Sequence, residues 1–491
     1  MTSLAVPSVA RVLPVDGGSA ELRQWLEDRL LQGAGQERHL WLVLPAPVRP
    51  VESLPAVSET ADFVDQAGHS VVWDPPNGMS MSGIGAAWKM QLQGTDRFRR
   101  LRDAADPVLK NIASTRHSAA PNLEPRVLGG FAFDEGAADQ DPWQDFGDGC
   151  FSLPRFVYGV DESQGVAQAG LALAVHGGEL VEESSRRSWL DATMNLLQRL
   201  EELDSSTSSG LGRDPMDGMA LLSGPEGVVG SEDVDDPDWI HRIEEIREAI
   251  ARGDVQKIVA ARRCEVDLRS PLAMPEVLAL LGRDLRASTR FAFGRSKSTF
   301  LGVTPERLLA KEGRRIHTEA LAGSIERGHA ADLLDSGKDR LEQQLVVDSI
   351  VRRLEPLCDR LQVAAKPTIR ELRDVLHLHT PILGALKESC HILDLVETLH
   401  PTPAVGGVPT PAAMEWIRNR ETHARGWYAA PIGWFDAQGD GELAVALRSC
   451  VLTHRKAYLF VGAGIVSDSD PVAELQETEL KKQALLSALQ G

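Results

Sequence analysis

The stretch GAGIVSDSDP, residues 462–471, connects an expected strand to an expected helix. Residues 458–461 before it are apolar and favour a strand, whereas the two glycines favour a turn. Asp470 is typical of a helix N-cap, and Pro471 suits the first helical position because its missing N–H is not needed there. The stretch therefore predicts a strand, a glycine turn and a helix beginning near residue 471.

Three charged residues follow on the same expected helix. Glu474, Glu477 and Lys481 are spaced at i, i+3 and i+7, which places them on one helical face. Two carboxylates and an ammonium beside a glycine turn could hold a divalent cation together with an anionic substrate. The alternative is a solvated helix face that carries an ion pair between Glu477 and Lys481. Helix spacing alone leaves both interpretations open.

The composition indicates an acidic, soluble protein. Among 491 residues, 52 are Lys or Arg and 71 are Asp or Glu, which gives a net charge of −19. Nucleic acid and anionic membranes need a basic surface, so we expect neither as a partner. The five cysteines are scattered without a C-x-x-C pair, which favours a reducing compartment over a disulfide framework or zinc ribbon. No signal peptide and no apolar run of roughly 20 residues is visible, and we expect a cytoplasmic protein.

Sequence patterns divide the chain into three parts. We expect residues 1–203 to be a divergent N-terminal part of the fold and residues 237–491 to be the catalytic region. Residues 204–236 are rich in Ser, Gly, Asp and Pro, which favours a flexible insertion or crossover. No internal repeat is visible.

Alternating and helical periodicities then predict the elements of the two larger parts. Expected strands cover 40–44, 70–73, 127–133, 156–158, 170–175, 255–263, 291–293, 299–303, 376–378, 427–435, 443–451 and 458–461. Expected helices cover 186–203, 239–250 with a stop at Gly253, 330–357, 385–399 and 411–421. Residues 436–441 are expected to form a hairpin turn. Late strands joined by hairpins favour an antiparallel sheet and hence the α+β class.

Several polar residues of the C-terminal part could carry chemistry. Lys257 lies in an apolar strand, where it is either an edge residue or a lysine in a lined cavity that could act as a base. Glu306 follows Pro305 at a strand end, and this motif alone favours a salt bridge with Arg307 or another basic residue over a chemical role. Arg448 lies in the expected strand 443–451, where it needs an anionic partner, either a ligand carboxylate or an internal acid.

Further candidates flank these residues. Gly323 and Ser324 suit a close approach of the backbone to a ligand, and Glu342 lies beside the apolar stripe of a helix. His377 and His379 share a strand face, but we do not expect a metal site there because no third His or Cys has suitable spacing.

Together these signals resemble the chorismate-utilising enzymes, which are the isochorismate, salicylate, anthranilate and aminodeoxychorismate synthases. The resemblance covers residues 237–491, and the N-terminal half fits only loosely, best at residues 82–86 (SGIGA). The ordered motifs are KIVAAR (257–262), TPERL (304–308), EALAGS (319–324), EQQLVVD (342–348), HPTPAVGG (400–407), RGWY (425–428), ALRS (446–449) and the opening stretch. Ser324 stands where the family usually has threonine, and Ala430 where it has glycine.

The resemblance implies a fold of two packed antiparallel sheets surrounded by helices, to which both halves of the chain contribute. It also implies Mg²⁺ bound by Glu342 and Glu477, with Glu474 close by or acting through water. The residues implied to contact the substrate are Gly323, Ser324, His400, Ala404, Tyr428, Arg448, Gly462 and Lys481.

Lys257 distinguishes among the enzymes of this family, because those that add water at C2 of chorismate resemble the chain in having this lysine. The implied reaction is chorismate to isochorismate, with Lys257 as the base toward water and Glu306 as the acid toward the C4 hydroxyl. Salicylate synthases share the lysine but typically have threonine at Ala404, so isochorismate is the expected product and salicylate synthase the alternative. We expect a monomer without a glutaminase subunit, serving quinone or siderophore synthesis. A non-catalytic chorismate-binding relative is a further alternative, which the intact acid and base disfavour.

Overall fold

The computed structural model describes residues 19–58, 69–163, 165–203, 228–233, 238–282, 287–372 and 375–490. The chain divides into two compact units, each assembled from separate segments. The first unit comprises Met1–Trp88, Lys110–Pro125 and Leu153–Asp214, and the second comprises Lys89–Leu109, Arg126–Ser152 and Pro215–Gly491. Most of the expected flexible segment 204–236 lies outside the described residues, and within it Val228–Asp233 forms strand β10. The three-part division of the chain stays a prediction.

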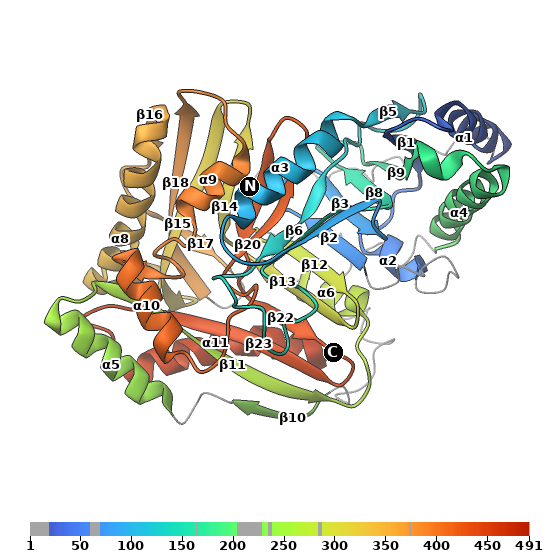
Figure 1. The fold of residues 1–491 in the computed structure, drawn as a ribbon. Coiled ribbons are helices and arrows are strands. Elements are labelled where there is room, and N and C mark those ends of the chain that lie inside the picture. Colours follow the sequence, from blue (N-terminus) through green and yellow to red (C-terminus); the bar gives the residue numbers. More distant parts are fainter. Residues whose placement is uncertain are drawn as a thin grey trace, which may run out of the picture. The chain divides into compact units, whose positions relative to one another are not determined.

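The first unit is a sheet with helices packed on it (Figure 1). Its strands lie in the order β2-β3-β8-β9-β1-β5. Its strands are β1 (His39–Ala46), β2 (His69–Asp74), β3 (Ser80–Ile84), β5 (Ala113–Arg116), β8 (Phe156–Asp161) and β9 (Gln168–His176). Its helices are α1 (Ser19–Gly33), α2 (Ser53–Ser58), the short 3-10 helix η1 (Gly177–Leu180) and α4 (Glu183–Glu202). Neighbouring strands are antiparallel except β1 and β5, which are parallel. Buried leucines of α1 and α4 form one core with the sheet, and the strands and helix predicted for this unit are confirmed.

The second unit contains two antiparallel sheets. One has the order β10-β11-β23-β22-β13-β12 with β19 beside β11, and the other β16-β18-β15-β14-β21-β20-β6-β7-β4 with β17 beside β18. The first of these sheets contains β10, β11 (Lys257–Leu268), β12 (Thr289–Arg295), β13 (Ser298–Thr304), β19 (Gly407–Val408), β22 (Ser449–Leu452) and β23 (Lys456–Ile465). The other contains β4 (Trp88–Leu92), β6 (Val127–Phe131), β7 (Gly149–Leu153), β14 (Arg307–Glu312), β15 (Arg315–Glu326), β16 (Cys358–Val363), β17 (Thr368–Glu371), β18 (Val375–Leu386), β20 (Pro431–Phe435) and β21 (Gly441–Val445).

Helices cover the sheets of this unit (Figure 1). They are α3 (Arg97–Lys110), α5 (Trp239–Arg252), α6 (Met274–Gly282), α7 (Ala330–Asp335), α8 (Gly337–Leu354), η4 (Glu355–Leu357), α9 (Ile392–Leu399), α10 (Thr410–Arg420) and α11 (Pro471–Gln490). Helix α8 packs on β15 and β18, while α5 and α11 pack on β11 and β23. The α+β class with two packed antiparallel sheets is therefore confirmed. Among the described helices, none is both long and apolar enough to cross a membrane.

Helix ends follow the residues that the sequence singled out. Gly253 ends α5 with a left-handed φ of 82°, and its N–H bonds to the carbonyls of Ala249 and Ile250. Asp470 caps α11, because its Oδ1 accepts hydrogen bonds from the N–H groups of Val472 and Ala473 at 3.1 and 2.8 Å. Both predicted helix signals are confirmed.

Two predictions near the later strands are wrong. Gly462 and Gly464 do not form a turn but lie inside β23, opposite Ala261 and Val259 of β11. The expected strand 443–451 is two strands, since β21 belongs to one sheet and β22 to the other. Arg448 lies in the link between them with a left-handed φ of 45°. Both errors have one cause: these residues are placed by contacts between elements, which a local pattern does not contain.

Three element boundaries also differ from expectation. The helix expected over 330–357 is divided at Ser336, whose Oγ accepts the N–H of Asp339 at the start of α8. The helix expected from 385 begins at Ile392, because residues 385–386 still belong to β18. The strand expected from Trp427 begins at Pro431, and the residues before it form a turn.

Candidate active site

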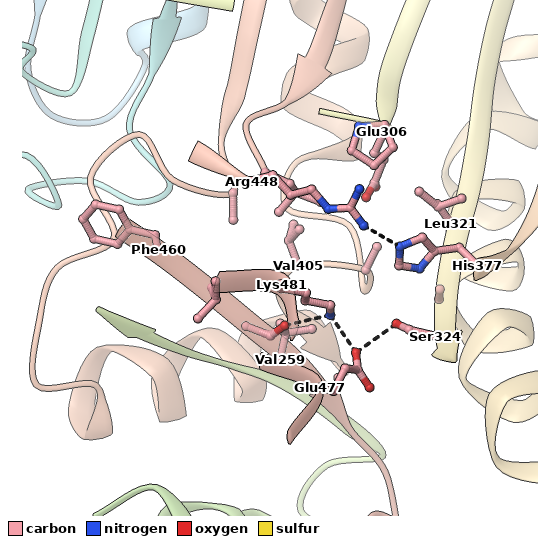
Figure 2. Close-up of a pocket in the computed structure, with 18 of the residues that line it drawn as sticks. Val259, Glu306, Leu321, Ser324, His377, Val405, Arg448, Phe460, Glu477 and Lys481 are labelled. Carbon is pink, nitrogen blue, oxygen red and sulfur yellow. Dashed lines mark hydrogen bonds and ion pairs between the residues drawn. The ribbon is translucent and has the colours of Figure 1, made fainter. Parts of the chain in front are cut away.

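A cavity that is partly open to solvent lies in the second unit. Both of its sheets contribute to the wall, through β11 and β23 on one side and β15 and β18 on the other. Helices α8 and α11 add carboxylates, and the links after β13 and β21 add Glu306 and Arg448. Figure 2 shows Glu306 and Arg448 at one end of the cavity and Glu477 and Ser324 at the other.

The structure brings most of the predicted site residues to this one cavity. Those that line it are Glu306, Gly323, Ser324, Glu342, Ala404, Tyr428, Arg448, Gly462, Glu477 and Lys481. Three predicted residues do not line the cavity: Lys257 and Glu474, which are buried, and His400, which is half-buried.

Lys257 is a buried partner of the cavity residue Glu342. Its side chain is fully buried, and its Nζ lies 2.8 Å from Oε1 of Glu342. The interpretation of Lys257 as an edge-strand residue is wrong, because β11 pairs with β23 on one side and β19 on the other at this point. Gly464 makes the contact possible: a Cβ there would lie 2.1 Å from Oε1 of Glu342 and 3.0 Å from Cε of Lys257. The glycine is therefore required by a close approach of side chains.

Glu477 and Lys481 form the ion pair that helix spacing allowed, with a distance of 2.6 Å. They are not on a solvated face, since both line the cavity. Oε1 of Glu477 also accepts the hydroxyl of Ser324 at 2.8 Å, and Nζ of Lys481 donates to the carbonyl of Gly462 at 3.0 Å. Burial alone would raise the pKa of Glu477, but the charge of Lys481 and these hydrogen bonds hold it below its usual value. Glu477 is therefore an ionised carboxylate at the cavity wall.

Glu474 lies next to this pair but points to a different partner. It is buried, and its Oε1 accepts the ammonium of Lys338 at 2.5 Å. Its Oε2 is buried without a hydrogen-bond donor among the residues that the structure describes. Burial and the neighbouring charge of Glu477 raise the pKa of Glu474. Glu474 and Glu477 each disfavour the negative charge of the other, and among the described residues one oxygen of Glu474 has no hydrogen-bond donor. A cation bound beside them would therefore be stabilised.

These carboxylates fit a hard divalent cation. Within the described ranges, no group of three or more His, Cys, Asp or Glu side chains is arranged as a complete metal centre. Mg²⁺ does not need one, because it commonly keeps several waters and takes one or two protein carboxylates together with groups of the substrate. Glu342 and Glu477 at the cavity wall, with the unsatisfied oxygen of Glu474 behind them, supply such a donor set.

Glu306 is the acidic group at the other end of the cavity. It follows β13, and burial, together with the charge of Glu319, raises its pKa to about 8. The predicted alternative of a salt bridge with Arg307 is wrong, because Nε of Arg307 binds Glu442 at 2.7 Å. A carboxyl that stays protonated near neutral pH can donate a proton to a leaving group.

Arg448 is held in place by a histidine that sequence reasoning missed as a site residue. Nη2 of Arg448 lies 3.0 Å from Nε2 of His377, and Nδ1 of His377 lies 3.1 Å from the carbonyl of Gly323. Burial, then the charges of Arg448 and Lys481, lower the pKa of His377 well below its usual value. The ring is therefore neutral, with Nδ1 donating to Gly323 and Nε2 accepting from Arg448. The available signal was strand pairing, since His377 stands opposite Ser324 of the EALAGS motif.

Arg425 is a second cavity residue that was not singled out, although it lies in the RGWY motif. Its guanidinium donates to the carbonyls of Val405 and Val259, both at 2.7 Å, and pairs with Glu421. It thereby fixes the segment that carries Ala404 against β11. Tyr428 stacks on Phe460, with ring centroids 5.5 Å apart.

His400 is not brought to the cavity. Its Nε2 lies 2.9 Å from the carbonyl of Phe133, against whose ring it also packs edge-on. Burial lowers its pKa to about 3, so the ring is neutral and its polar atom is used within the protein. Nor do His377 and His379 face a common partner, because Nε2 of His379 lies 2.9 Å from Oε2 of Glu319.

Comparisons with known proteins agree with this fold. Residues 29–490 match the family described as "Chorismate binding enzyme". Isochorismate synthase MenF of Bacillus subtilis is 32% identical over 442 residues, covering 86% of this chain and 88% of that protein. The salicylate biosynthesis isochorismate synthase of Pseudomonas aeruginosa is 32% identical over 496 residues, covering 98% and 97%. The structure of the menaquinone-specific isochorismate synthase MenF from Escherichia coli superposes with a TM-score of 0.70 at 24% identity, covering 95% of this chain and 99% of that one.

The chain therefore belongs to the chorismate-binding enzyme family, and the family resemblance of its motifs is confirmed. Two relatives that span nearly its whole length are isochorismate synthases by name. The likeness to the Escherichia coli structure supports the fold of two sheets.

Proposed function

We propose that the protein is an isochorismate synthase, which converts chorismate to isochorismate. The observation that carries the proposal is the pair of groups that the reaction needs: a fully buried lysine, Lys257, and a carboxyl, Glu306, that burial keeps protonated near neutral pH. The names of the two full-length relatives support the same reaction. A protein that only binds chorismate would need neither group.

The reaction adds water at C2 and removes the hydroxyl at C4, so that substrate and product have the same composition. Lys257 would take a proton from the attacking water, and Glu306 would give a proton to the departing hydroxyl. Lys257 must be neutral for its step.

Arg448 and Tyr428 would bind the carboxylates of the substrate, with backbone groups near Gly323 and Gly462. A guanidinium suits this role because it offers two parallel N–H donors to a carboxylate. Support comes from the position of Arg448 on the cavity wall, where His377 orients it. Lys481 would lie beside the metal-bound end of the substrate.

We also propose that Mg²⁺ binds to Glu342 and Glu477, with Glu474 close by or acting through water. When bound, the ion would neutralise and orient a substrate carboxylate. We further propose a monomer that needs no glutaminase subunit. We also propose that it acts in the cytoplasm, in quinone or siderophore synthesis.

Product analysis by liquid chromatography with mass spectrometry tests the proposal, because chromatography separates chorismate from its isomer isochorismate, which has the same mass. Chorismate and Mg²⁺ should give isochorismate without pyruvate, with or without ammonium. Stoichiometric pyruvate and salicylate would instead identify a salicylate synthase, and an ammonium-dependent aminated product would identify an aminating enzyme. Either result refutes the proposed function.

Two variants then test the roles of the acid and base. Lys257→Ala and Glu306→Gln should each abolish turnover while leaving chorismate binding measurable by calorimetry. Lys311→Ala is a matched control, because it also removes a buried lysine, one that pairs with Asp440 and does not line the cavity. Near-normal turnover by Lys257→Ala would refute its role as the base.

A further inference from the structure

Three polar side chains, from the neighbouring strands β15, β17 and β18, form a cluster next to Glu306. Arg370 of β17 binds Glu319 of β15 through two parallel hydrogen bonds, Nη1 to Oε1 at 2.7 Å and Nη2 to Oε2 at 2.8 Å. Nε2 of His379 in β18 lies 2.9 Å from the same Oε2. The Glu319 side chain is 3% exposed, and none of the three residues lines the cavity. They are not part of the cavity wall, and their hydrogen bonds lead to the chain around Glu306.

The cluster binds both peptide groups of Glu306. Nη1 of Arg370 donates to the carbonyl of Pro305 at 2.7 Å, which is the peptide group before Glu306. Oε1 of Glu319 accepts the N–H of Arg307 at 2.9 Å, which is the peptide group after it. The carbonyl of Glu306 itself accepts the N–H of Val445. The backbone that carries the proposed acid is thus fixed on both sides by one charged pair.

Glu319 also supplies a permanent negative charge. Burial opposes its ionisation, but the hydrogen bonds from His379 and Arg370 outweigh burial and lower its pKa to about 2. The charged groups that act on Glu306 are Glu319 of β15, Lys257 of β11 and Arg370 of β17. Of these, Glu319 favours the protonated form of Glu306, whereas Lys257 and Arg370 favour the ionised form. Arg448 and His377 line the same cavity.

We propose that Glu319 is a positioning residue for Glu306: with Arg370 and His379 it fixes both peptide groups of Glu306 and supplies a negative charge that acts on the acid. This charge adds to burial, which is the larger cause, in favouring the protonated Glu306 carboxyl. The inference rests on the proposed function, in which Glu306 is the general acid. A purely structural role for Glu319, as the partner of a buried arginine, would make the protein less stable when removed but would not move the titration of Glu306.

Glu319→Gln separates these two roles. The amide keeps an oxygen that can accept the N–H of Arg307 but removes the negative charge. We expect the alkaline limb of the kcat profile to move to lower pH by one unit or more. The infrared band of the protonated Glu306 carboxyl, assigned by its loss in Glu306→Gln, should show the same shift without substrate. Unchanged positions of both the limb and the band midpoint would overturn the inference.

Two further variants sharpen the test. Glu442→Gln is the matched control, because it also removes one negative charge, from a carboxylate that binds the side chain of Arg307 at 2.7 Å, and it should leave the limb in place. Glu319→Asp keeps the charge but shortens the side chain, so the limb should stay while the kcat plateau falls at least threefold. This variant keeps the inference testable if Glu319→Gln does not fold. A displaced limb in Glu319→Asp with an unchanged plateau would contradict it.

The infrared measurement also distinguishes the two proposals. If Glu306→Gln turns over chorismate normally, the acid role of Glu306 fails, and with it the reason for the inference. If Glu306→Gln is inactive but Glu319→Gln titrates like the wild type, the proposed function stands and the role of Glu319 alone is refuted.

Discussion

Replacing Gly464 by alanine should damage stability and activity together. The added Cβ would lie 2.1 Å from Oε1 and 3.0 Å from Cδ of Glu342. Ordinary contacts are about 3.5–4.0 Å between carbon atoms, so the carboxylate must retreat by roughly 1 Å. It cannot do so freely, because Nζ of Lys257 is 2.8 Å from that oxygen and Cε of Lys257 is itself 3.0 Å from the new methyl group.

The magnitude follows from three contributions. Overpacking of a tight core costs about 1–3 kcal/mol. Complete loss of a buried ion pair costs about 3–5 kcal/mol. A pair that is displaced but still formed costs only part of this. Replacing a strand glycine by alanine stabilises the protein by about 0.5–1 kcal/mol, because the unfolded chain then has less conformational entropy to lose. We therefore expect Gly464→Ala to lower the free energy of unfolding by about 2–4 kcal/mol.

Urea unfolding and steady-state kinetics measure the two effects of Gly464→Ala. Adding Glu342→Asp shortens the opposing side chain, so the double variant should recover part of the lost stability but not the activity. Gly337→Ala is the control, because a Cβ at this first residue of α8 meets nothing within 4 Å. A free energy of unfolding within about 0.5 kcal/mol of the wild type, with unchanged kcat, would refute the account of Gly464.

Three further predictions concern the cavity wall. The raised pKa of Glu306, about 8, makes the protonated acid the main form below that pH, so kcat should fall about tenfold per pH unit above it, and a flat profile to pH 10 would contradict this. His377→Leu removes the acceptor for Arg448, a hydrogen bond to a charged group worth about 1.5–3 kcal/mol, so KM for chorismate should rise about 10–100-fold with a smaller change in kcat, as steady-state kinetics would show. Ser324→Ala removes the donor to Glu477 and should weaken Mg²⁺ binding about tenfold by calorimetry, while an unchanged dissociation constant would exclude an orienting role.

Local patterns in the sequence predicted most elements of the fold. The helix that begins at Pro471 and the one that ends before Gly253 were recognisable because capping residues act on the next few N–H or C=O groups. The hairpin between β20 and β21 was recognisable for a similar reason. Local signals failed where a neighbour distant in sequence decides, as at Gly464, whose missing side chain accommodates Glu342 of α8.

The sequence predicted which residues belong to the site. It did not predict which of them line the cavity and which lie behind its wall. Family motifs indicated ten of the residues that line the cavity. They did not indicate that Lys257 lies behind Glu342, that His400 faces Phe133, or that His377 holds Arg448. Each of these depends on which strands pair and on what a buried polar atom finds beside it. Such contacts arise only when the sheets are paired and packed, so they cannot be predicted from local patterns in a single sequence.

The passage of the chain from β21 to β22 has a consequence for the lengths that this sequence can tolerate. Residues 446–448 carry the chain from one sheet to the other, and Arg448 within them has a φ of 45°, a conformation that costs a residue with a side chain about 1–3 kcal/mol. An inserted or deleted residue here would shift the pairing of β21 with β14 or of β22 with β13, and would withdraw the guanidinium from the cavity. The turn between β20 and β21 joins strands of one sheet and has a different anchor, because Asp440 binds Lys311 and the N–H of Gly313. A change in chain length should therefore be rejected at residues 446–448.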